Sequence, residues 1–327
     1  MKSLMKWVGM ALLAIVVAGG AALGLMRAGA FNPSWEQVKE RWAGPPSKFV
    51  KVGAVTLHVR DEGQGPVVLM LHSSMSNLRI WDAWADRLKT RHRVIRIDWP
   101  PYGLSIDPRP STGLQGVMKL VEAFVEQEKL DHFAIVGSSS GATLSVLYAA
   151  AHPDKVTALA LSTLPLEAPP PTHVNWAETA TIWMHENVVP NYYPKFFYRW
   201  TLSSLYGTPS RLKDETVDWY YDTNNLQGGF ARVRAYYQAN KKSLWKKGAG
   251  AEAAQIRVPI LLQWGDRDIV LPTYLADKAV KQFANAPVTL IHYPDVGHYP
   301  MLELPDKTGA DLDAFLSRVE KPATKTQ

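Results

Sequence analysis

The sequence contains no cysteine, and this absence removes several kinds of chemistry at once. Without a thiol the chain forms no disulfide, holds no thiolate zinc or iron-sulfur site and has no cysteine nucleophile. Glycine and proline, at 22 and 23 of 327 residues, are not enriched, which excludes a fibrous or low-complexity chain. The length is instead sufficient for one large α/β domain with an insertion.

Excess charge of one sign is also absent from most of the chain. The formal net charge is +6, but three of the 36 basic residues, Lys2, Lys6 and Arg27, precede the first acidic residue. The remaining 33 basic residues are nearly balanced by 30 acidic ones. This balance argues against a nucleic-acid-binding protein, so we expect no nucleic-acid partner.

No charged residue occurs from Trp7 to Met26, a run of 20 residues. As a helix this run would be about 30 Å long, which matches the hydrocarbon core of a bilayer. Secretory signals usually have a shorter apolar stretch, of about 7 to 15 residues, so we expect residues 1–30 to be an uncleaved membrane anchor. The alternative is a signal sequence cleaved near Ala28–Ala30, which would release a secreted protein.

Basic residues flank this apolar run unequally. Lys2, Lys6 and the amino terminus precede it, whereas only Arg27 follows it directly. The positive-inside tendency therefore keeps the amino terminus in the cytoplasm. We expect the rest of the chain on the periplasmic or extracytoplasmic side of the membrane.

From residue 49 onward, short apolar strands alternate with helical patterns, which predicts a largely parallel sheet covered by helices. The opening segment 49–60 alternates in polarity around Gly53 and predicts an antiparallel hairpin before the buried strand 67–71. The other predicted strands are 94–98, 132–136, 156–161, 258–264 and 288–293. The predicted helices are 80–88, 116–130, 141–151, 274–283 and 311–319.

The alternation stops between residues 166 and 255, which hold 16 of the 34 aromatic residues. We therefore predict a helical, aromatic-rich cap inserted into one catalytic domain. The predicted division is the anchor 1–30, the first part of the core 31–165, the cap 166–255, the second part of the core 256–319 and the tail 320–327. The aromatic residues suggest an apolar or aromatic substrate of modest size, although an insert of this length also needs them for its own core.

The segment Gly137-Ser-Ser-Ser-Gly141 joins a predicted strand directly to a predicted helix. This is the context in which G-x-S-x-G holds a serine on a sharp turn and exposes its hydroxyl. Ser139 is therefore the candidate nucleophile. The helix that begins at Ser140 directs free N–H groups and its positive dipole end towards the same point, which favours a developing oxyanion.

A neutral serine needs a base, and the candidate is His298, which follows the last predicted strand. A third group should be a carboxylate that orients the imidazole and stabilises its cation. Asp268 follows the strand 258–264. The resulting chain order of serine, aspartate and histidine is the order expected when a G-x-S-x-G turn carries the nucleophile.

Five sequence pieces in this order resemble the α/β-hydrolase superfamily, in particular its capped, esterase-like branch, over residues 49–319. They are Leu71–Ser74, Asp98–Ser105, the turn at Ser139, Gly265–Pro272 and Gly297–Pro305. The resemblance implies an eight-stranded, mostly parallel sheet with helices on both faces, and it places the acid at Asp268 rather than at Asp266. It further implies catalysis without a metal or an organic cofactor.

One departure from the family pattern concerns the loop after the strand 67–71. Relatives usually have His-Gly at this point, whereas this chain has His72-Ser73. The resemblance still implies that the backbone N–H groups of Ser74 and Ser140 form an oxyanion hole. The side chain of His72 is expected to pack and hydrogen-bond so that it shapes the loop, without a catalytic role.

The resemblance implies hydrolysis of a carboxylic ester of a small apolar or aromatic substrate through an acyl-enzyme. A serine at position 139 argues against the dehalogenase and epoxide-hydrolase branches, which attack with a carboxylate. Two alternatives use the same three side chains: carbon-carbon bond hydrolysis of a diketone-type ring-cleavage product, and a cofactor-free haloperoxidase-like reaction. A non-catalytic binding member of the fold is the remaining alternative, and such proteins usually lose one of the three residues.

Overall fold

Eight β-strands form one sheet in the computed structural model, which describes residues 2–167, 183–184, 186–241 and 248–320. The strands are β1 (Ser47–Val52), β2 (Val55–Glu62), β3 (Val67–Leu71), β4 (Arg93–Ile97), β5 (Phe133–Ser138), β6 (Val156–Ser162), β7 (Ile260–Gly265) and β8 (Val288–Tyr293). Their order across the sheet is β1-β2-β4-β3-β5-β6-β7-β8. Strand β2 is antiparallel to β1 and β4, and all other neighbours are parallel, so the predicted sheet is confirmed.

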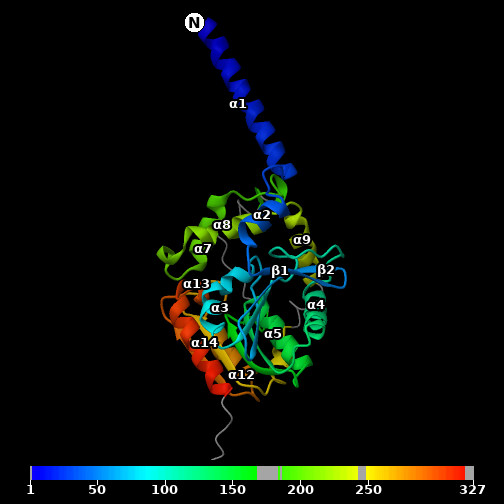
Figure 1. Ribbon diagram of the computed structural model, residues 1–327. Coiled ribbons are helices and arrows are strands. Elements are labelled where there is room, and N and C mark those ends of the chain that lie inside the picture. The colour runs from blue at the N-terminus through cyan, green and yellow to red at the C-terminus, as the bar shows by residue number, and fades with distance from the viewer. Residues whose placement is uncertain (1, 168–182, 185, 242–247, 321–327) are drawn as a thin grey trace, which may run out of the picture.

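Helices cover both faces of this sheet, as Figure 1 shows. Helices α4, α5 and α12 contribute to the hydrophobic core on one face, and α3 and α14 contribute to the core on the other. The helices of the described residues are α1 (Lys2–Ala28), α2 (Trp35–Trp42), η1 (Leu78–Trp81), α3 (Asp82–Leu88), α4 (Leu114–Gln127), α5 (Ser140–Ala151), α7 (Lys195–Leu205), η2 (Pro209–Arg211), α8 (Asp214–Asn224), α9 (Gly229–Asn240), α11 (Gly250–Ala253), α12 (Tyr274–Gln282), α13 (Pro300–Glu303) and α14 (Pro305–Val319).

The central strands are apolar on both sides because each face of the sheet is covered. In β3, Leu69 and Leu71 pack under α4 and α5, whereas Val68 and Met70 pack under α3 and α14. All four side chains are fully buried. This two-residue alternation fixes the face of the sheet on which each side chain lies. The parallel direction of neighbouring strands places their carboxyl ends at one edge.

The segment between β6 and β7 holds α7, α8 and α9, which lie beyond the carboxyl edge of the sheet in Figure 1. We call this segment the cap, as the sequence predicts. The exact limits at 166 and 255 stay a prediction. Residues 168–182, 185 and 242–247 within the segment, and 321–327 of the predicted tail, lie outside the described residues.

Helices α2 and α14 are among those that differ from the sequence prediction. Helix α2 was not predicted, although Ser34 and Gln37 form a capping box at its start. Helix α14 begins at Pro305 instead of residue 311, because proline is favoured in the first turn, where its missing N–H costs no hydrogen bond.

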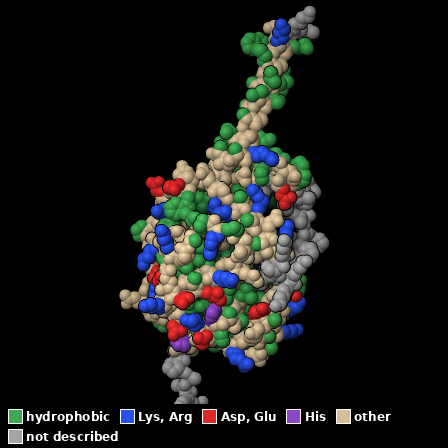
Figure 2. Space-filling model, turned by 90° about the vertical axis from the view of Figure 1, so that its right-hand side faces the viewer, with side chains coloured by type: hydrophobic (Ala, Val, Ile, Leu, Met, Phe, Trp, Pro, Cys, Tyr) green, Lys and Arg blue, Asp and Glu red, His purple; other side chains and the backbone are tan. Residues whose placement is uncertain are grey.

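Helix α1 projects from the rest of the molecule with its side chains exposed. Its segment Ser3–Ala28 has a mean hydropathy of 2.3 over its most apolar window and is long enough to cross a membrane. Figure 2 shows it as a rod of mostly hydrophobic side chains standing clear of the globular part. The molecule therefore has one amino-terminal apolar helix that is a candidate membrane span.

The tight approach of α5 to β3 predicts a stability effect at Gly141. A Cβ atom on Gly141 would overlap the carbonyl oxygens of Leu71 and His72, whereas a Cβ on Gly44 has nothing within 4 Å. We expect Gly141→Ala to lower the free energy of unfolding by about 1–3 kcal/mol and Gly44→Ala to leave it nearly unchanged. Urea denaturation of the full-length protein in detergent measures both, and equal stability of the two variants would contradict the close packing.

Candidate active site

Ser139 lies on the turn between β5 and α5, in a backbone conformation that non-glycine residues rarely adopt. Its φ is 50° and its ψ is −121°, and such a conformation costs about 1–3 kcal/mol and persists only where the surrounding structure imposes it. Its N–H donates to the carbonyl oxygen of Ser162 at 3.0 Å. The side chain is half-buried, so the strained turn leaves the hydroxyl accessible.

His298 and Asp268 form a buried pair beside this turn. The Nδ1 atom of His298 lies 2.8 Å from Oδ2 of Asp268, and the two residues are each 5% exposed. The other carboxylate oxygen, Oδ1, accepts the N–H groups of Val270 at 2.8 Å and Leu271 at 3.0 Å. An ionised Asp268 has only acceptors, so it assigns the proton to Nδ1 and leaves Nε2 as the basic nitrogen of a neutral His298.

The alternative carboxylate, Asp266, is bound elsewhere. Its Oδ1 atom lies 2.7 Å from Nδ1 of His292, and both side chains are more than one third exposed. Asp266 therefore belongs to a surface pair, and Asp268 as the acid stays a prediction.

Ser139 and His298 are each hydrogen-bonded to the end of β6. The carbonyl of Ser162 accepts the N–H of Ser139, and the next residue, Thr163, donates its hydroxyl to the carbonyl oxygen of His298 at 3.4 Å. Within the described part of the chain, no hydrogen bond joins the Ser139 hydroxyl to the His298 ring. Catalytic hydrogen bonds are often long in free enzymes and tighten when substrate binds.

The predicted oxyanion residues, Ser74 and Ser140, are in direct contact. The N–H of Ser74 donates to the side-chain oxygen of Ser140 at 2.8 Å, and the two hydroxyl oxygens are also 2.8 Å apart. The N–H of Ser140, the first residue of α5, has no acceptor within its own helix. A substrate oxygen that binds both amides would therefore replace the Ser140 hydroxyl at the amide of Ser74.

His72 holds the loop that carries Ser74. Its Nδ1 donates to the carbonyl oxygen of Ser73 at 2.7 Å, and its Nε2 accepts the N–H of Trp99 at 3.1 Å. The imidazole also stacks on the Trp99 ring with centroids 4.9 Å apart. Complete burial lowers the pKa of His72 to about 4, so the ring is neutral at pH 7 and serves to shape the loop.

Comparison with known proteins identifies the family. A sequence profile described as the alpha/beta hydrolase fold matches residues 66–305, which is most of the chain. The chain belongs to this family. It is a hydrolase of the esterase and lipase type, because the similar curated proteins include ester-cleaving enzymes.

Two curated relatives of this hydrolase and one solved structure illustrate the similarity. The pimeloyl-[acyl-carrier protein] methyl ester esterase of Nitrosomonas europaea is 25% identical over 268 residues, covering 80% of this chain and 99% of the relative. The human monoacylglycerol lipase ABHD6 is 26% identical over 268 residues, covering 79% of this chain and 77% of the relative. The crystal structure of a membrane phospholipase A, described as a bacterial virulence factor, superposes with a TM-score of 0.71 at 22% identity, covering 98% of this chain and 100% of that one.

Glu303 is a further residue that positions the site of this hydrolase. Its carboxylate accepts three backbone N–H groups, from Gly297 at 2.6 Å, Gly207 at 3.1 Å and Thr208 at 3.0 Å. It thereby ties the loop before His298 to the cap, and burial raises its pKa. Glu303 lies within the sequence piece Gly297–Pro305, and no role was predicted for it, although a lone carboxylate in the apolar run 299–305 indicates a buried acceptor.

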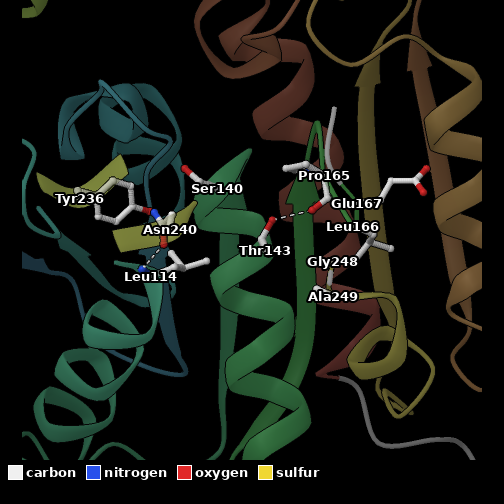
Figure 3. Close-up of a pocket in the computed structure, with 10 residues that line it drawn as sticks. All are labelled: Leu114, Ser140, Thr143, Pro165, Leu166, Glu167, Tyr236, Asn240, Gly248 and Ala249. Atoms are coloured by element: carbon white, nitrogen blue, oxygen red, sulfur yellow. Dashed lines mark hydrogen bonds between the residues drawn. The ribbon is translucent and has the colours of Figure 1, made fainter. Parts of the chain in front are cut away.

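A small cavity of about 30 Å³ lies between α5 and the cap, and Figure 3 shows the residues around it. Ser140 and Thr143 of α5 line one side, and Tyr236 and Asn240 of α9 line the other. Asn240 also accepts the N–H of Leu114 at 2.8 Å, which fastens the cap to the start of α4. The cavity has room for one or two waters.

The buried pair and the surface pair give a matched test of the two aspartates. We expect Asp268→Asn to lower kcat about 10⁴-fold, because the amide would favour the wrong tautomer of His298. Asp266→Asn should change kcat by no more than about twofold, as for most surface substitutions. Steady-state hydrolysis of p-nitrophenyl acetate measures both values. The reverse ranking would assign the acid to Asp266.

The lowered pKa of His72 predicts loss of stability in acid. The unfolded chain takes up this proton near pH 6.5, whereas the folded chain does so only near pH 4, so stability falls as the pH decreases through this interval. Between pH 6.5 and 5 the loss attributable to His72 is about 2 kcal/mol. Urea denaturation at both pH values should show a smaller pH dependence for His72→Asn, and an unchanged dependence would contradict a buried, neutral imidazole.

Proposed function

We propose that this hydrolase cleaves carboxylic esters of small apolar or aromatic acyl compounds through an acyl-enzyme on Ser139. The observation that carries the proposal is the buried 2.8 Å pair of His298 and Asp268 beside the strained turn of Ser139. The ester-cleaving activities of the methyl ester esterase and of the monoacylglycerol lipase support an ester substrate. No observation favours the carbon-carbon hydrolase or the haloperoxidase-like reaction.

In the proposed reaction, Nε2 of His298 takes the proton of the Ser139 hydroxyl as its oxygen attacks the ester carbonyl. The N–H groups of Ser74 and Ser140 stabilise the oxyanion once the Ser140 hydroxyl has rotated away. The imidazolium, stabilised by Asp268, gives its proton to the leaving alcohol. Water then attacks the acyl-enzyme by the same route, which releases the acid and restores the serine.

We also propose that α1 stays attached and anchors the hydrolase in a membrane. The apolar length of the helix and its exposed surface support a span, and the basic residues before it support an extracytoplasmic catalytic part. Cleavage near Ala28–Ala30 would break the hydrogen bonds that Arg27 forms with the carbonyl oxygens of Asn187 and Val188. These contacts favour the anchor over a removed signal.

The nucleophile is tested by comparing two adjacent serines. We expect Ser139→Ala to lower kcat for p-nitrophenyl esters by about four to six orders of magnitude and to abolish labelling by a fluorophosphonate. Ser138→Ala is the matched control, because its side chain is fully buried within β5 and its hydroxyl has no hydrogen-bond partner among the described residues. Hydrolysis and labelling that survive in Ser139→Ala would reject the proposed nucleophile.

A further inference from the structure

The end of α1 is attached to the cap rather than to the sheet. Arg27 donates to the carbonyl oxygens of Asn187 at 2.8 Å and Val188 at 3.1 Å, and Asn191 donates back to the carbonyl oxygen of Arg27 at 2.9 Å. Asn32 adds a bond to the carbonyl oxygen of Asn191 at 2.8 Å. Figure 1 shows α1 leaving the molecule at the end occupied by α8 and α9, opposite the end occupied by α12 and α14.

Large apolar side chains are exposed around the junction, by which we mean the contacts between the end of α1 and the cap. Phe31 is 49% exposed, and its ring lies 6.1 Å from that of Tyr192. Trp183 and Met184, at 60% and 52% exposed, are hydrogen-bonded through their carbonyl oxygens to Asn187 and Val188, the residues that Arg27 binds.

Helix α7 continues this apolar surface. Phe196 is 74% exposed and follows Tyr192 by four residues, so its Cα lies within about 14 Å of that of Tyr192. Trp200, which is 42% exposed, follows one turn later on the same side of α7. We call the exposed apolar side chains of these segments the cap patch: Phe31, Trp183, Met184, Phe196 and Trp200.

The basic residues at the junction are not neutralised by acidic partners. Arg27 and Arg234 donate to backbone carbonyls and, among the described residues, form no ion pair. Lys195 and Arg199 of α7 are paired with Asp218 and Asp214. A surface that combines exposed aromatic rings with unpaired arginines matches the interface of a bilayer that contains anionic lipids.

We propose that the cap patch lies in the headgroup layer of the bilayer that α1 crosses, and that the natural substrate is an amphiphilic acyl ester supplied by this membrane. Phe31 follows the last residue of α1 by three positions and lies beside Tyr192, and Asn191 is hydrogen-bonded to Arg27 and Asn32. Phe31 is therefore held at the surface of the membrane that α1 crosses. The inference rests on the proposed anchoring and on the proposed ester hydrolysis. The partner is therefore a phospholipid surface with anionic lipid.

The absence of cysteine allows a direct test with single spin labels. The full chain, with Phe196→Cys or Asp131→Cys, is labelled and reconstituted in vesicles of phosphatidylcholine and phosphatidylglycerol. Asp131 is the control because it is exposed and precedes β5 at the opposite edge of the sheet. Label 196 should be more accessible to oxygen than to a water-soluble nickel chelate, and label 131 should show the reverse. Equal accessibility of the two labels would overturn the membrane contact.

A second measurement separates membrane contact from catalysis. Phe196→Asp should lower the hydrolysis of a monoacylglycerol embedded in these vesicles by about tenfold, because a charge replaces the ring that inserts into the bilayer. Turnover of p-nitrophenyl acetate in detergent should not change, and Phe196→Leu should keep most of the vesicle activity. Unchanged vesicle hydrolysis in Phe196→Asp would contradict the proposal. If the unmodified protein hydrolysed no ester at all, the proposed function would be refuted, whereas the spin-label result would still stand.

Discussion

The strained backbone at Ser139 is the constraint on which the site depends. A φ of 50° for a serine persists only because α5 packs directly against β3, where the carbonyls of Leu71 and His72 leave space for nothing larger than Gly141. The same packing brings the start of α5 beside the loop that carries Ser74. One local conformation therefore sets both the position of Ser139, the proposed nucleophile, and the position of the proposed oxyanion amides.

The cap also contributes to the position of His298. The N–H of His298 donates to the carbonyl oxygen of Leu205 at the end of α7, at 2.7 Å, and Glu303 binds both the loop of His298 and the residue Gly207. His298, the proposed base, is therefore held partly by the cap. With the cap patch in the bilayer, contacts run from the membrane through the cap to His298. This continuity provides a physical route by which a lipid surface influences activity.

Much of the fold could be predicted because buried parallel strands leave apolar runs in the sequence, and because Ser139, Asp268 and His298 each follow such a run. The contact of the Ser140 hydroxyl with the amide of Ser74 could not be predicted, because it depends on one side-chain rotamer where two distant segments meet. The bonds of Glu303 join segments about 90 residues apart, and no local pattern specifies them. Helix α2 was missed although its capping residues were present, because it is short and mostly polar.

The most direct test of the account is a crystal structure of the hydrolase after reaction with an alkyl phosphonate, which mimics the tetrahedral intermediate. We predict a bond from phosphorus to Oγ of Ser139 and a phosphonyl oxygen within about 3.1 Å of the amides of Ser74 and Ser140, with the Ser140 hydroxyl rotated away. Nε2 of His298 should lie within about 3.2 Å of an oxygen on phosphorus. A phosphonate on another residue, or an imidazole that stays out of reach of the reacted serine, would contradict the account.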